Sequence, residues 1–166
     1  MFADAIERVG DYTRLVRTIT RDYKSTAVVP GAATLFFVND DGWAVTCKHV
    51  ADLIINADHI VEQYHQFQQE RGLLPVNKNR KAALKRLEQK YNYHSGVTVQ
   101  IKNNFLDCVT PINEIDFIMH GNCDLAILHF NGYTERHYQG HAIFAKSDNI
   151  ARPGDFLCRL GYPFPE

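Results

Sequence analysis

The apolar residues of this chain change their spacing along the sequence, from a helical period near the N-terminus to short alternating runs further on. From Phe2 to Tyr23 the apolar positions recur every three or four residues, at Phe2, Ile6, Val9, Tyr12, Val16, Ile19 and Tyr23, and residues 4–23 are taken as the first element. That spacing is typical of one face of an α-helix. Asp4 followed by Glu7 fits a capping box at its start. The pattern predicts an N-terminal helix within residues 1–24, packed on the outside of the following domain or against a partner protein.

Short apolar runs dominate residues 25–56 and 97–130. Thr34 to Val38 and Gly42 to Val50 are two of them, and the polar residues between them end in Gly42, which suits a tight turn because glycine accepts a positive φ. Similar runs at 97–101, 112–120 and 125–130 are separated by Asn, Gly and Asp residues. Many short strands with such turns favour an antiparallel β-barrel over alternating βαβ units.

Residues 57–95 interrupt this pattern. Their apolar residues return to helical spacing on both sides of Gly72-Leu-Leu-Pro75, which predicts a helix, a turn and a second helix inserted between strands. The second helix is basic, with Lys78, Arg80, Lys81, Lys85, Arg86 and Lys90. Such a charge run is usually a solvated helix face, and contact with an acidic partner is the alternative.

One stretch carries candidate chemistry. In Gly42-Trp-Ala-Val-Thr-Cys-Lys-His-Val50 a buried strand is predicted to run into a sharp corner, with His49 at the corner. Histidine titrates near neutral pH and can take or give a proton there. A single histidine at a strand end is more often a hydrogen-bonded structural residue, so His49 needs a partner before it indicates a function.

Three segments resemble the trypsin-like serine peptidase family, and they occur in that family's order. Thr46-Cys-Lys-His-Val50 is similar to the family's histidine motif, in the variant of bacterial HtrA-like members. Cys123-Asp-Leu-Ala-Ile-Leu128 resembles the aspartate motif. Arg152 to Asp155, with Leu160-Gly-Tyr-Pro163, resembles the strand that opens the second barrel. The resemblance covers residues 28–56 and 97–166.

The resemblance implies a mainly β, chymotrypsin-like fold. Its first barrel would span residues 25–150 with the helical hairpin 57–95 inserted, and residues 151–166 would begin a second barrel. The implied activity is hydrolysis of peptide bonds in a protein or peptide substrate, with His49 as general base and Asp124 as the carboxylate that orients it. Asp116 is the weaker alternative, because it lacks the Asp-Leu-Ala-Ile-Leu continuation.

The family's nucleophile lies in a Gly-x-Ser-Gly-Gly loop, and Ser25, Ser95 and Ser147 are not followed by a glycine pair. We therefore expect the serine beyond residue 166, and we expect these 166 residues alone to be inactive. No cofactor or metal is implied. The alternative is a peptidase-like binding or scaffolding module without catalysis, which could meet a partner protein through the hairpin 57–95 or the N-terminal helix.

Composition adds little to this interpretation. The net charge of −1 gives no reason to expect nucleic acid, and 45% hydrophobic residues are ordinary for a globular protein. No apolar run approaches the roughly 20 residues that span a bilayer, and the first residues do not resemble a secretory signal, so we expect a cytoplasmic protein.

The four cysteines lack a pairing pattern and are expected to be reduced and buried. A zinc site from Cys47, His49 and Cys123 is the least favoured alternative.

Overall fold

The computed structural model describes residues 2–146, 151–153, 157–158 and 160–162. Helices and strands take up similar shares of the chain, 29% and 31%, so the fold is mixed and the expectation of a mainly β protein is wrong. The helices are α1 (Phe2–Gly10), α2 (Lys48–Gly72) and α3 (Arg80–Lys90). The strands are β1 (Thr13–Asp22), β2 (Val29–Phe37), β3 (Trp43–Thr46), β4 (Thr98–Phe105), β5 (Val109–Thr110), β6 (Glu114–Met119), β7 (Ala126–Asn131) and β8 (Glu135–Arg136).

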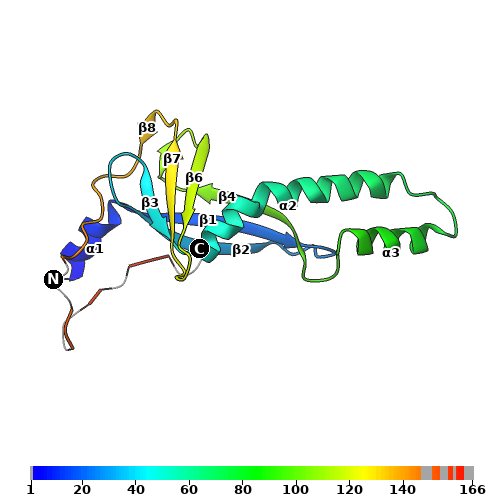
Figure 1. Cartoon of the computed structure of the whole chain (residues 1–166), viewed down its shortest axis with the longest axis horizontal. Helices are drawn as coiled ribbons and strands as arrows, with labels where there is room; N and C mark the ends of the chain where they lie inside the picture. The colour runs from blue at the N-terminus through cyan, green and yellow to red at the C-terminus, as the bar shows by residue number, and fades with distance from the viewer. Residues whose placement is uncertain (1, 147–150, 154–156, 159, 163–166) are drawn as a thin grey trace. The chain divides into compact units, whose positions relative to one another are not determined.

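The principal sheet is antiparallel, and six strands follow the order β4-β1-β2-β3-β7-β6 in a curled half-barrel (Figure 1). Strands β5 and β8 form a separate two-stranded sheet. The predicted antiparallel, barrel-like arrangement is therefore confirmed, whereas its identity with a chymotrypsin-like barrel stays a prediction. Of the predicted second barrel, residues 154–156, 159 and 163–166 lie outside the described residues, and the described residues of 151–162 contain no strand.

The chain divides into two compact units, and their boundaries differ from the predicted ones. The first unit comprises residues 1–17, 32–52 and 104–166, and the second comprises residues 18–31 and 53–103. Strands β1, β2 and β4 and helix α2 each contribute residues to both units.

The predicted helix over residues 4–23 is wrong beyond Gly10, because β1 begins at Thr13. The residues that the strand buries include Thr13 and Thr18, while Ile19 is exposed. In β1 the spacing of apolar residues therefore does not indicate which side chains are buried. Residues 13–20 are rich in Thr, Val and Ile, whose branched Cβ atoms favour an extended chain.

Residues 57–95 contain two helices, as predicted, but the first of them begins at Lys48 and runs unbroken to Gly72. Figure 1 shows α2 and α3 side by side, and Lys90 Nζ lies 2.6 Å from Glu70 Oε1. Their inner faces share one core with a residue of β4 and with residues of the loops after β1 and after α3; this core is made of Tyr23, Tyr64, Phe67, Leu87, Tyr93 and Val99. The hairpin is thus part of the second unit's hydrophobic core, and not a separable appendage.

The turn between β2 and β3 is fixed by the core of the first unit. The ring of Tyr138 stacks on Phe37 at a centroid distance of 3.5 Å. The Tyr138 hydroxyl accepts a hydrogen bond from Gly42 N and donates one to Asn39 O, each at 3.0 Å. Burial raises the pKa of this phenol to about 12, which keeps the hydroxyl able to donate. The turn that precedes the histidine corner is therefore held at both ends.

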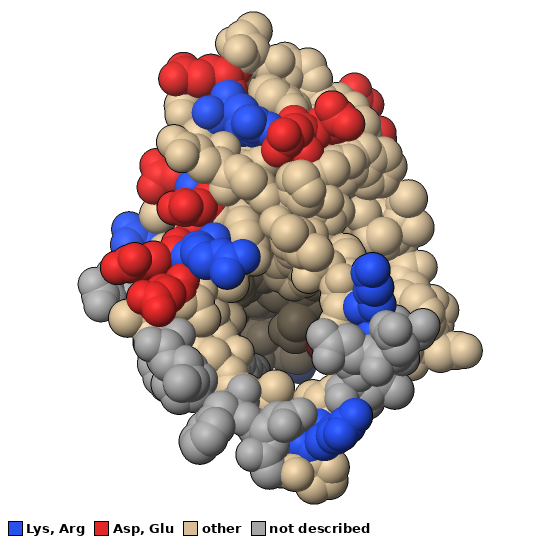
Figure 2. Space-filling model, turned by 90° about the vertical axis from the view of Figure 1, so that its left-hand side faces the viewer, with Lys and Arg blue, Asp and Glu red and all other residues tan. Residues whose placement is uncertain are grey.

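The face shown in Figure 2 is hollowed, and its acidic and basic side chains are interspersed. Among the described residues of this face, basic side chains form no broad surface that would attract a polyanion. Among the described residues, no helix combines the length and the apolar character needed to cross a bilayer.

Replacing Phe67 by alanine should destabilise the second unit by about 3–5 kcal/mol, because the fully buried ring leaves a cavity among tyrosines. Urea unfolding followed by tyrosine fluorescence measures the change. Leu73→Ala is the control, since Leu73 is 85% exposed and its truncation should change the free energy of unfolding by less than about 0.5 kcal/mol. Equal effects of the two substitutions would contradict this core.

Replacing Gly42 by alanine should also be costly, by about 2–4 kcal/mol. Gly42 has a φ of +83°, and an added Cβ would lie 2.8 Å from the carbonyl oxygen of Phe130. The control is Gly10→Ala, where an added Cβ would meet nothing within 4 Å. Thermal unfolding of both variants would refute the account of this turn if Gly42→Ala proved as stable as the wild type.

Candidate functional site: the His49–Asp124 pair

The pairing of β3 with β7 brings two distant segments together. The two strands are antiparallel, with Thr46 opposite Ala126 and Trp43 opposite His129. Residues just after Thr46 must therefore lie beside residues just before Ala126. This register places His49 next to Asp124, 75 residues further along the chain.

His49 also occupies the first turn of helix α2. The carbonyl oxygen of Cys47 accepts hydrogen bonds from Val50 N and Ala51 N, each at 3.1 Å, so Cys47 is the N-cap residue. The N–H of His49, one of the donors that a helix leaves without an internal partner, donates to Asp124 Oδ1 at 3.0 Å. A carboxylate at this end of a helix is also favoured by the helix dipole. Asp124 thus caps α2 from a different segment of the chain.

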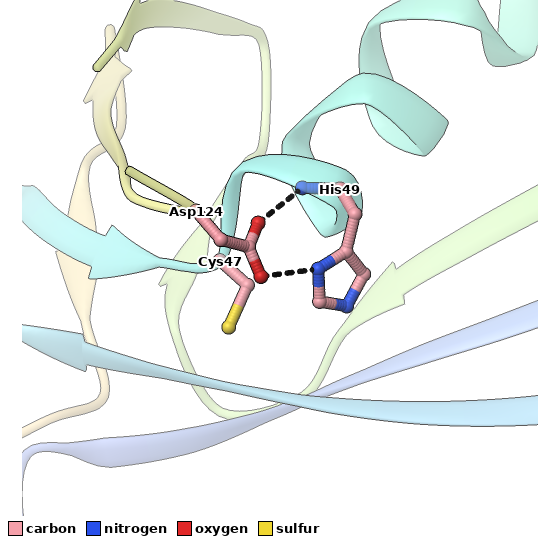
Figure 3. A group of neighbouring side chains, drawn as sticks. All are labelled: Cys47, His49 and Asp124. Atoms are coloured by element: carbon pink, nitrogen blue, oxygen red, sulfur yellow. Dashed lines mark hydrogen bonds and ion pairs between the residues drawn. The ribbon is translucent and has the colours of Figure 1, made fainter. Parts of the chain in front are cut away.

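The second carboxylate oxygen contacts the imidazole. His49 Nδ1 lies 2.7 Å from Asp124 Oδ2, so the contact predicted from the sequence is present (Figure 3). An ionised carboxylate can only accept, so Nδ1 carries the proton and donates, and Nε2 of the neutral ring is left as the basic atom. The two side chains are 67% and 56% exposed, so water screens their interaction.

These two contacts shift the carboxyl group. The backbone N–H of His49, and after it the imidazole, stabilise the ionised form and hold the pKa of Asp124 below its ordinary value of 3.8. Asp124 therefore carries its charge throughout the neutral range, as a group that orients an imidazole must.

The loop that carries Asp124 is organised by His120, a histidine that the sequence analysis did not single out. His120 Nδ1 accepts hydrogen bonds from Asn122 N at 3.1 Å and Cys123 N at 3.0 Å. The carbonyl oxygen of His120 also accepts from Lys48 Nζ at 3.3 Å. His120 is therefore a positioning residue for Asp124. Nothing in the sequence indicated this role except that His120 lies close to the aspartate motif.

Asp116, the alternative orienting residue, belongs to another pair. It lies opposite His129 in the β6–β7 pairing, with Oδ2 4.0 Å from His129 Nδ1, and it accepts from Asn131 Nδ2 at 2.8 Å. The choice of Asp124 over Asp116 as the residue that contacts His49 is therefore correct. The roles of His49 and Asp124 in catalysis stay predictions.

A cavity of about 580 Å³ opens beside His49. Its lining comes from β2, the histidine corner and the C-terminal segment: Ala32, Ala33, Thr34, Cys47, His49, Val50, Leu160, Gly161 and Tyr162. Tyr162 N donates to Thr34 Oγ1 at 2.7 Å, which holds Tyr162 beside β2. The imidazole thus borders a space large enough for part of a peptide.

The burial of the cysteines differs from what the sequence predicted. All four are free, but Cys47, Cys123 and Cys158 are exposed and Cys108 alone is buried. Burial raises the pKa of the Cys108 thiol to about 12, which makes it unreactive. The predicted burial of the other three is wrong because Cys47 and Cys123 flank the open site and are not within strands.

The residues that could bind a metal ion differ from those of the zinc site considered from the sequence. Within the described residues, the potential ligand atoms of Cys47, His49 and Asp124 all lie within 4.8 Å of one another, and Cys123 is not part of this group. Thiolate, imidazole and carboxylate are all ligands of Zn²⁺ in proteins. The zinc site considered from the sequence used Cys123, but the side chain that lies against His49 is the carboxylate of Asp124.

No family model and no curated protein matches this chain. The resemblance to trypsin-like peptidases therefore rests on the three short motifs and on the geometry of the His49–Asp124 pair.

The lowered pKa of Asp124 predicts a pH dependence. Because the folded pKa lies below the unfolded one, the pair stabilises the fold above pH 3.8, and this contribution is lost as the pH falls through the lowered pKa. The ¹³C shift of the Asp124 carboxyl carbon, followed from pH 7 to pH 2, should show a midpoint below 3.8. Replacing His49 by alanine should raise that midpoint by removing the imidazole donor, whereas His129→Ala should leave it unchanged. A wild-type midpoint at or above 3.8 would contradict the pairing.

Proposed function

We propose that this chain belongs to a trypsin-like serine endopeptidase, in which His49 is the general base and Asp124 orients it. The observation that supports this proposal most strongly is the 2.7 Å contact between His49 Nδ1 and Asp124 Oδ2, formed by residues of two family-like motifs in the family's order.

The chemistry follows from the tautomer. With Nδ1–H donated to Asp124, Nε2 is unprotonated and can accept a proton from a hydroxyl nucleophile as that hydroxyl attacks a peptide carbonyl. The ring then becomes an imidazolium, which the adjacent carboxylate stabilises. Figure 3 shows Nε2 on the side of the ring away from Asp124, where such a hydroxyl could approach.

The substrate would reach the base through the cavity beside His49. Small residues of β2 and the C-terminal segment, namely Ala32, Ala33, Thr34 and Gly161, line part of this space, so an extended peptide could enter on that side. Gly161 and Tyr162, which lie beside Thr34 of β2, are proposed to lead into the second barrel of the complete enzyme.

The nucleophile is expected among residues that follow Glu166, in a Gly-x-Ser-Gly-Gly loop. In the described structure Asp124 is more than half exposed, whereas the carboxylate of a working triad is buried. We expect the second barrel to cover the pair and exclude water from it, which would strengthen the interaction between the two side chains.

A fluorophosphonate probe tests this proposal on the natural protein with all residues that follow Glu166. The probe should modify one serine in that region. Replacing His49 by alanine should abolish labelling, and Asp124→Asn should slow it by about 10²–10⁴-fold, because the imidazole is then no longer held in its basic tautomer.

Asp116→Asn is the matched control, since it removes the charge of an exposed aspartate beside a different histidine and should leave the labelling rate within about twofold of the wild type. Folding of each variant is checked by circular dichroism. Absence of any labelled serine in a folded wild-type protein would rule out the peptidase and favour the binding or scaffolding module.

A further inference from the structure

The three side chains at the histidine corner form a mixed cluster of sulfur, nitrogen and oxygen donors. Cys47 and His49 come from the start of α2, and Asp124 comes from the loop before β7 (Figure 3). Their potential ligand atoms lie within 4.8 Å of one another, and all three residues are exposed. The catalytic proposal uses His49 and Asp124 but gives no task to the exposed thiol of Cys47.

We propose that Cys47, His49 and Asp124 bind a zinc-like divalent cation, and that this cation switches off the base. The effect on the base rests on the proposed function, whereas the binding of the cation does not. The cation would be held by Cys47 Sγ, His49 Nδ1 and one carboxylate oxygen of Asp124, and solvent would supply any remaining ligand.

The observed separations suit such a site. Zn–S bonds of about 2.3 Å and Zn–N or Zn–O bonds of about 2.0–2.2 Å in a tetrahedral arrangement place ligand atoms roughly 3.3–3.6 Å apart. Side-chain rotations would have to widen the 2.7 Å contact between His49 Nδ1 and Asp124 Oδ2 by roughly 0.6 Å and turn the thiol of Cys47 toward the ion. Because all three side chains are exposed, these rotations disturb no buried packing.

Binding would change the tautomer of His49. In the metal-free pair Nδ1 carries the ring proton and donates it to Asp124. A cation bound to Nδ1 takes that position, so the single proton of the neutral ring moves to Nε2. The thiol of Cys47 loses one proton to solvent on binding, and no other proton leaves the site. With Nε2 protonated, the imidazole cannot accept a proton from a nucleophile.

Cysteine suits this task because of its place in the helix. Cys47 is the N-cap residue, and its carbonyl oxygen is fixed by hydrogen bonds from Val50 and Ala51. Its Cα is therefore held two residues from His49 on a rigid turn, and only the thiol has to turn toward the imidazole. Cys123, although adjacent to Asp124 in sequence, does not share this position.

Titration of the full chain with Co²⁺, a spectroscopic substitute for Zn²⁺, tests the binding directly. We expect one ion per chain and a thiolate-to-cobalt charge-transfer absorption that Zn²⁺ abolishes by competition. Cys47→Ser should remove this absorption and weaken Zn²⁺ binding by about tenfold or more in calorimetry, and Asp124→Asn should also weaken it.

Cys123→Ser is the matched control, because it removes an exposed thiol beside Asp124 that lies outside the cluster. It should leave both the absorption and the affinity unchanged. Circular dichroism establishes that each variant is folded. The inference is overturned if the wild type does not bind Zn²⁺, if Cys47→Ser binds it as tightly, or if the control loses binding to the same extent.

A second arm separates this inference from the proposed function. In the natural protein, Zn²⁺ should slow fluorophosphonate labelling in the wild type and in Cys123→Ser, but much less in Cys47→Ser. Binding of Zn²⁺ by a protein that no fluorophosphonate labels would refute only the peptidase. Labelling that Zn²⁺ leaves unchanged at saturating binding would refute the switch and leave the peptidase standing.

Discussion

The pairing of β3 with β7 is the constraint on which the candidate site depends. Its register sets Thr46 opposite Ala126, and this fixes the distance between the start of α2 and the loop that carries Asp124. A shift of one residue in that register would turn every side chain of one strand to the other face of the sheet. Buried Ala44, Ala126 and Leu128 resist such a shift, because it would turn them away from the core and put their partly exposed strand neighbours in their place.

Asp124 serves two structural purposes with its two oxygens, and this explains why the pair is well defined despite its exposure. Oδ1 accepts from the backbone N–H of His49, and Oδ2 contacts the ring. The backbone contact holds the carboxylate in place whatever the imidazole does, because the helix terminus otherwise lacks a partner for that donor. Asp124 is thus both a helix cap and the group that selects the histidine tautomer. His120 supports the same carboxylate by ordering the loop before it.

Much of the sheet could be predicted from the sequence, because its strands carry local signals. Gly42 has the positive φ that its turn required, and β4, β6 and β7 lie where alternating or apolar runs predicted them. The helix predicted across residues 13–22 failed for a physical reason. Threonines take buried positions there while an isoleucine is exposed, so hydrophobic periodicity gave the wrong secondary structure. Local pattern also could not reveal that Tyr23 packs with Phe67, since that contact joins segments far apart in the chain.

The candidate site shows a similar division. Two motifs predicted that His49 and Asp124 meet, and the strand register explains why they do. The closeness of Cys47 to this pair depends instead on how the N-terminus of α2 faces the loop before β7. The spacing of residues in the sequence does not reveal that arrangement. The sequence also could not show that His49 and Asp124 are exposed, because exposure depends on which other parts of the protein cover them.

The most direct test of this account is the tautomer of the neutral His49 ring, measured by long-range ¹H–¹⁵N correlation spectroscopy on the metal-free chain. We predict the Nδ1–H form in the wild type. In Asp124→Asn the amide oxygen would remain on the backbone N–H of His49 and the amide NH₂ would face Nδ1, so the ring should change to the Nε2–H form. A wild-type ring in the Nε2–H form, or one that Asp124→Asn leaves unchanged, would contradict the claim that Asp124 prepares His49 to act as a base.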